Sequence, residues 1–109
     1  MVHACVQTVT VEHPVNKSDL FTCNGLTVTI DILKIHPLNE DINRQGIALI
    51  LNLISPDRYV RYSAAQARHL AMSNGIVDVL HRVQKEFRSK NDILVTSKGI
   101  LDLIIADYS

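Results

Sequence analysis

The sequence has few aromatic residues and no surplus of either charge. It contains no Trp, three Tyr and two Phe, too few for an aromatic platform that stacks single-stranded bases. Eleven Lys and Arg residues balance eleven Asp and Glu residues, so the formal net charge is zero. Nucleic-acid-binding domains and polybasic membrane-binding segments normally carry a basic surplus. The composition therefore predicts that the partner is neither a nucleic acid nor a membrane.

Cysteine is also scarce, and no apolar run is long. Cys5 and Cys23 lack the CxxC spacing of a metal or redox site, and a disulfide-stabilised domain would need more than two cysteines. Residues 1–14 lack the basic and apolar regions of a secretory signal. No apolar run approaches the about 20 residues that cross a bilayer. We expect a cytoplasmic, or at least intracellular, protein.

The polar residues form no recognisable catalytic or metal-binding motif. None of the five histidines is paired at i,i+4 spacing, and no HExxH motif occurs. His13 and His36 each precede a proline at the end of a predicted helix, where a histidine can interact with the helix dipole. Asp31 and Asp102 interrupt apolar helices and are expected to face solvent. We predict no enzymatic activity, no cofactor and no metal.

The clearest predicted helix spans residues 39–54. Asn39 is placed to cap its first turn, and Pro56 ends it. Ser55 is also placed to cap a following helix that has Pro56 at its first position. The apolar positions recur every three or four residues, which is the helical period, at Ile42, Gly46, Leu49, Ile50, Leu53 and Ile54.

Three further helices are predicted in the second half. The first covers residues 58–73 and ends at Asn74-Gly75, a pair that suits a left-handed turn. The second has an apolar stripe at Ile76, Val79, Leu80, Val83 and Phe87, opposite Asp78, Arg82, Lys85 and Glu86. After a polar turn at 88–91, the third has apolar residues at Ile93, Ile100, Leu101, Leu103 and Ile104.

The first third of the chain supports two interpretations. VQTVTVE and LTVTIDI alternate apolar residues with Thr, which is typical of strands. The second segment also fits a helix, because Leu26, Ile30, Leu33 and Ile35 fall close to one face. The alternative to an all-helical protein is therefore a small α+β domain that binds a ligand or acts as an enzyme.

The sequence contains an internal repeat. Residues 24–54 and 74–105 both begin with Asn-Gly, continue with an apolar helix and reach a polar turn that contains Asn and Asp. Each then has a second helix with a central Gly-Ile pair, at 46–47 and 99–100. A helical unit that recurs at about 40–50 residues is typical of armadillo and HEAT proteins.

Residues 19–55 resemble an armadillo repeat. The positions that match the family pattern are Gly25, Leu33, Asn39, Ala48, Leu51, Asn52 and Leu53. Residues 68–105 resemble a second repeat more weakly. The resemblance implies a single all-α domain, residues 1–109, folded as a right-handed α-solenoid. It would comprise a partial unit at 1–17, one repeat at 18–55 and another at 56–109.

The resemblance also implies a scaffold that binds a protein or peptide partner on its third helices. Asn52 occupies the position whose amide binds the backbone of an extended ligand, and Gln45 and Arg44 lie earlier on the same helix. The matching place in the second repeat falls at Ile104 or Ile105, so the Asn is absent there. A HEAT-type domain without a peptide groove remains an alternative.

Three further features bear on partners. Ala48 stands where the importin-like branch of the family has a Trp, so a receptor for nuclear localisation signals is not predicted. Arg58, Arg61 and Tyr62 have the composition of an interaction hot spot, although Arg stacked on Tyr also suits a solvated helix face. If the chain ends the solenoid, exposure of Ile104 or Ile105 predicts self-association through that edge.

Overall fold

The computed structural model describes residues 24–56 and 62–108, and regular structure in these ranges is entirely helical. The five helices are α3 (Gly25–Ile35), α4 (Glu40–Ile54), α5 (Ala64–Ser73), α6 (Ile76–Glu86) and α7 (Asn91–Tyr108). The all-α class is therefore confirmed for the described residues. The strand interpretation of LTVTIDI is wrong because this segment lies inside α3, whereas VQTVTVE lies outside the described residues.

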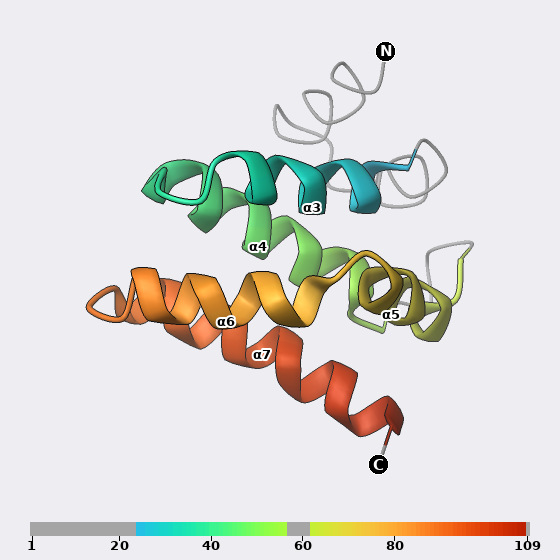
Figure 1. Ribbon diagram of the computed structural model, residues 1–109. Coiled ribbons are helices and arrows are strands. Elements are labelled where there is room, and N and C mark those ends of the chain that lie inside the picture. Colours follow the sequence, from blue (N-terminus) through green and yellow to red (C-terminus); the bar gives the residue numbers. More distant parts are fainter. Residues whose placement is uncertain (1–23, 57–61, 109) are drawn as a thin grey trace.

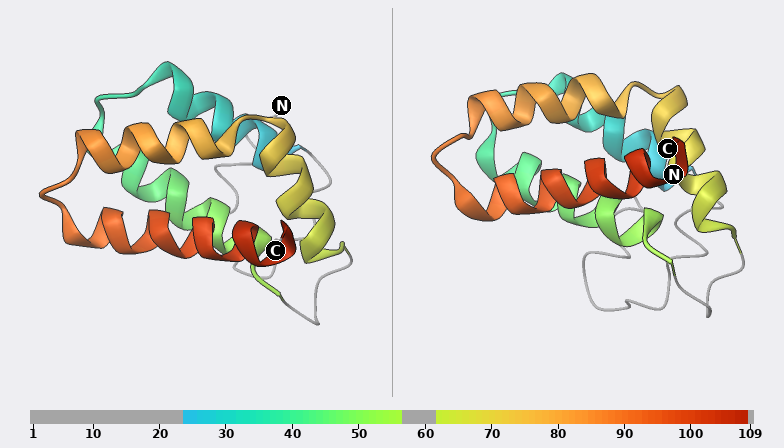
Figure 2. Two further views of the ribbon diagram at one scale, coloured as in Figure 1. Left: turned by 60° about the horizontal axis from the view of Figure 1, so that its bottom comes forward. Right: turned by 90° about the horizontal axis from the view of Figure 1, so that it is seen from below.

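The helices form two layers that share one core. Helices α3 and α6 lie side by side in one layer, and α4 and α7 lie side by side in the other (Figures 1 and 2). Short turns connect α3 to α4 and α6 to α7, so each pair forms a helical hairpin. Helix α5 crosses one end of the layers and packs against all four other helices.

The core is almost wholly aliphatic, and every described helix contributes to it. Its one aromatic member among the described residues is Phe87. The buried hydrophobic residues are Leu26, Ile30, Leu33, Ile47, Ile50, Leu53, Ile54, Ala67, Ala71, Ile76, Val79, Leu80, Val83, Phe87, Ile93, Ile100 and Ile104. All five residues of the stripe predicted on α6 are buried, which confirms that stripe.

Some positions on the predicted stripes lie elsewhere. Ile35 is 69% exposed, because it belongs to the last turn of α3, where the chain leaves the core. On α4, Ile47 and Asn43 are buried, whereas Ile42 and Leu49 are only partly buried. The buried face of α4 is therefore centred on neighbouring positions, and part of the predicted stripe lies at its edge.

Side-chain caps are found at the starts of α4 and α5. The Asn39 side chain accepts a hydrogen bond from the Ile42 amide at 3.0 Å, and Ser55 ends α4 in an extended conformation before Pro56. The next helix is capped by Ser63, whose side chain accepts from the Gln66 amide. The prediction that Ser55 caps a helix starting at Pro56 is wrong, because Pro56 is not helical and the next described helix begins at Ala64. The Ser55 hydroxyl instead donates to the Leu51 carbonyl of α4.

Both Asn-Gly pairs place a left-handed residue immediately before a helix. Gly75 has φ 79° before α6, which agrees with the predicted left-handed turn. Asn24 has φ 65° before α3, and Asn is one of the few residues besides Gly that adopt this conformation readily. The two hairpins thus begin with the same kind of turn.

Candidate partner-binding face on α4 and α7

The burial pattern repeats at a spacing of 50 residues. Every member of eight pairs is buried: Leu26 and Ile76, Thr29 and Val79, Ile30 and Leu80, Leu33 and Val83, Asn43 and Ile93, Ile47 and Ser97, Ile50 and Ile100, Ile54 and Ile104. The hairpin α3–α4 is therefore equivalent, position by position, to the hairpin α6–α7. The Gly-Ile pairs at 46–47 and 99–100 are 53 positions apart, so they do not occupy equivalent positions in this register.

Exposed positions on α4 and α7 follow the same spacing. The exposed pairs are Asp41 and Asn91, Gln45 and Val95, Ala48 and Lys98, and Asn52 and Asp102. On each helix these positions are three or four residues apart, so they form one stripe along the helix. We call the two stripes together the α4–α7 face.

The two stripes point the same way because α4 and α7 meet through opposite flanks. Arg44 and Leu51 lie on one flank of the α4 stripe, and their neighbours Asp92 and Gly99 lie on the opposite flank of the α7 stripe. A Cβ atom on Gly99 would lie 3.7 Å from the Leu51 methyl carbons, so the helices are in close contact here. Figure 2 shows α4 and α7 side by side in one layer.

Asn52 and Gln45 are both exposed on this face, as a partner-binding role requires. Within the described part of the chain, neither side-chain amide has a hydrogen-bond partner. Each amide offers two donors and an acceptor on one planar group. They can therefore bind a backbone N–H and a backbone carbonyl of an extended ligand.

Arg44 forms ion pairs that connect α4 to α7 at the surface. Its guanidinium donates to Glu40 Oε2 at 2.7 Å and to Asp92 Oδ2 at 2.5 Å, and lies 3.5 Å from Asp41 Oδ1. Hydrogen bonding from Arg44 lowers the pKa of Glu40 and of Asp92, and the two carboxylates raise the pKa of Arg44. Arg44 therefore joins α4 to α7. Its role in partner binding stays a prediction, and its side chain is 36% exposed.

Tyr62 also makes a contact within the protein. It is partly buried against the core, and its hydroxyl donates to the Leu53 carbonyl at 2.8 Å. This contact fixes the chain just before α5. The other two residues of the predicted hot spot, Arg58 and Arg61, lie outside the described residues.

The equivalent of Asn52 in the second hairpin is Asp102. The position expected at Ile104 or Ile105 is wrong, because Ile104 is buried in the core and Ile105 lies three residues beyond Asp102. Asp102 is exposed, as is Asp31, which confirms both predictions. The two Asn-Gly pairs are also 50 positions apart. Adding this spacing to Asn52 gives Asp102, so the sequence contained the signal that identifies it.

Neither the described side chains nor the comparisons identify a known site. Among the described residues, no group of three or more His, Cys, Asp or Glu residues could hold a metal ion. No described helix has the length and hydropathy needed to cross a membrane. No family model, curated protein or solved structure matches the chain.

Proposed function

We propose that the protein is a scaffold of the armadillo type that binds a protein or peptide partner on the α4–α7 face, as a subunit or segment of a larger assembly. One observation carries this proposal: the two hairpins share a 50-residue burial register that leaves equivalent stripes exposed on neighbouring helices. Helical repeats stack in this manner and use the surface formed by equivalent helices for binding. The two hairpins would be successive repeats of a right-handed α-solenoid.

The side chains on the α4–α7 face are suited to binding an extended peptide. Gln45 and Asn52 offer amides along α4, while Val95, Lys98 and Asp102 offer an apolar contact and both charges along α7. A peptide lying across the two helices would exchange backbone hydrogen bonds with the amides. Its side chains would then be selected mainly by α7.

The test is to identify partners and then to remove the two equivalent polar side chains. Partners captured by the wild-type chain from its native source, and identified by mass spectrometry, are assayed against the double variant Asn52→Ala/Asp102→Ala. We expect binding to fall at least about tenfold, as for truncation of hot-spot residues. Both side chains are exposed, so the free energy of unfolding should change by less than about 0.5 kcal/mol.

Asp31→Ala is the matched control, because Asp31 is exposed on α3 in the other layer. This variant should retain every partner. If the double variant also keeps all partners with unchanged affinity, the α4–α7 face is not the binding surface. Self-association remains a second prediction, supported by Ile105, which is 59% exposed near the end of α7.

A further inference from the structure

The turn between α3 and α4 exposes two large apolar side chains. Ile35 is 69% exposed and Leu38 is 73% exposed, and they are only three positions apart. Single exposed apolar residues are common on protein surfaces, but adjacent ones often mark an interaction site. Half of the four exposed large hydrophobic residues in the described part of the chain thus lie in this one turn.

The fold itself does not require apolar residues at these positions. The equivalent positions in the turn between α6 and α7, 50 residues later, are Lys85 and Arg88, and both are exposed. Leu38 also has no helix-capping role. It precedes the cap residue Asn39, but the residue against which it would pack in a hydrophobic staple is the polar Asn43.

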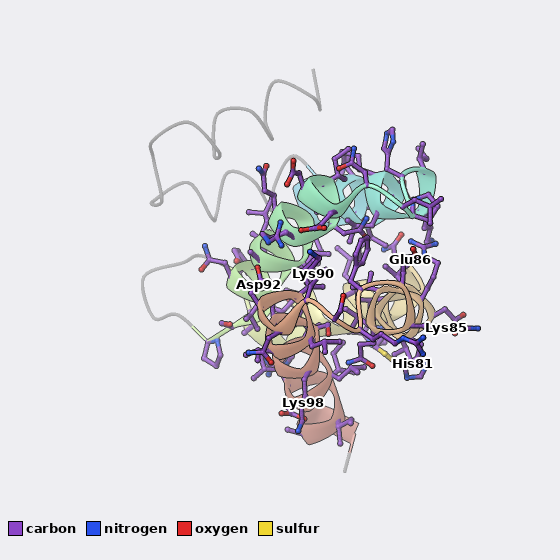
Figure 3. All side chains as sticks on the ribbon, turned by 90° about the vertical axis from the view of Figure 1, so that its left-hand side faces the viewer. His81, Lys85, Glu86, Lys90, Asp92 and Lys98 are labelled. Atoms are coloured by element: carbon purple, nitrogen blue, oxygen red, sulfur yellow. The ribbon has the colours of Figure 1, made fainter. Side chains whose placement is uncertain are left out.

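The two turns lie at the same end of the molecule. The Arg82 guanidinium donates to the Leu33 carbonyl at 2.7 Å, and Lys90 Nζ lies 3.6 Å from Glu40 Oε1. These contacts join the end of α3 to α6 and the start of α4 to the turn before α7. Figures 1 and 2 show the turns together, and Figure 3 views this end directly.

This end of the molecule has a basic surplus. Residues 33–38 and 82–90 contain five Lys and Arg residues but only one acidic residue, Glu86. The nearby carboxylates of Glu40, Asp41 and Asp92 are held by Arg44. Lys85 and Arg88 are exposed and have no ion pair among the described residues, so they are available to a partner.

We use the name turn end for the surface formed by Ile35, Leu38, Lys85 and Arg88. We propose that the turn end binds an acidic segment of a partner protein, and that this segment carries a large apolar side chain. The apolar side chain would pack on Ile35 and Leu38, and carboxylates beside it would pair with Lys85 and Arg88. This inference rests on the proposed scaffold function and names a second contact surface and its partner class. A protein is favoured over a lipid surface because the chain has zero net charge and Glu86 lies between the two basic residues.

The experiment selects binders from a displayed library of random peptides against the full wild-type chain. We expect selected peptides to be enriched in Asp and Glu around one or two large apolar residues. Their affinity should fall at least about tenfold in Ile35→Ser/Leu38→Ser and in Lys85→Glu/Arg88→Glu, and should weaken as salt is raised. Circular dichroism establishes that each variant remains folded.

One control variant and three contradicting outcomes test this inference. Ala65→Glu adds a negative charge at an exposed position on α5 and should leave peptide binding unchanged. Loss of peptide binding in Asn52→Ala/Asp102→Ala but not in the turn-end variants would overturn this inference while supporting the α4–α7 face. Selection of peptides without acidic enrichment would overturn it as well. The inference would also be overturned if no acidic peptide is selected and the chain instead binds phosphatidylserine vesicles through Ile35 and Leu38.

Discussion

The second helix of each hairpin contains one glycine, and the two glycines have different surroundings although an Ile follows each. A Cβ atom on Gly46 would lie 2.6 Å from Leu33 Cδ2 and 3.2 Å from Leu33 Cγ, and Leu33 is fully buried. A Cβ atom on Gly99 would meet only the Leu51 methyl carbons, at an ordinary contact distance of 3.7 Å. Gly46 is therefore required for the close approach of α3 and α4, whereas Gly99 is not required at its position.

We predict opposite effects of the same substitution at these two sites. Gly99→Ala should stabilise the protein by about 0.5–1 kcal/mol, because Ala has the higher helix propensity and fits the available space. Gly46→Ala should destabilise it by about 1 kcal/mol, because overpacking against Leu33 outweighs the same gain. Urea denaturation followed by circular dichroism measures both, and equal effects at the two sites would contradict the difference in packing.

The burial of Asn43 could not be predicted from the sequence, because it depends on contacts with the turn between α3 and α4. Its side chain donates to the His36 and Asn39 carbonyls at 2.9 and 2.7 Å, which closes the turn between α3 and α4. The equivalent position in the second hairpin is Ile93. Helical periodicity places either residue on the same face, but only the positions of the two carbonyls show how the buried Asn43 amide nitrogen is satisfied.

The contact between α4 and α7 includes an ion-pair cluster around Arg44. Lowered pKa values of Glu40 and Asp92 mean that the folded protein binds protons there less readily than the unfolded chain. The stabilisation is therefore present above the unfolded carboxyl pKa values, about 4, and is lost as pH falls through the lower, folded values. All three side chains are at least one-third exposed, so the contribution is small and falls with salt.

We predict that Arg44→Met weakens the pH dependence of stability on the acid side. In the wild-type protein, the urea midpoint should fall as pH is lowered from about 5 to 3, partly through Glu40 and Asp92. The variant should show a shallower fall over this range and less sensitivity to salt. Lys98→Met is the control, because Lys98 is exposed on α7 without an ion pair among the described residues, and parallel pH curves for the two variants would refute the Arg44 role.

The sequence predicted that a helix follows α4, but it did not predict where α5 starts. Both Ser55 and Ser63 precede residues with helical tendency, and either side chain can cap a helix. The structure distinguishes them because Ser55 completes α4 and Ser63 accepts from Gln66. That choice depends on where α5 must start in order to cross both layers, which no local pattern records.

The arrangement of the whole molecule depends on α5. It packs against α3, α4, α6 and α7, and it buries two alanines fully, Ala67 and Ala71. Small side chains allow its backbone to approach four neighbours at once, so α5 joins the two hairpins into one core. Apolar periodicity predicted α4 and α6, since their stripes are strong. It could not predict this junction, because an alanine-rich helix has little amphipathic signal.

We predict that enlarging Ala71 disturbs both hairpins together. Ala71→Leu should destabilise the protein by about 1–3 kcal/mol, because the added atoms cannot fit into a filled core. Ala65→Leu is the matched control: Ala65 is exposed on the same helix, and its variant should stay within about 0.5 kcal/mol of wild type. Since α5 contacts every other described helix, hydrogen exchange in Ala71→Leu should accelerate in α3–α4 and α6–α7 alike. Faster exchange in one hairpin alone would show that the two fold as separate units.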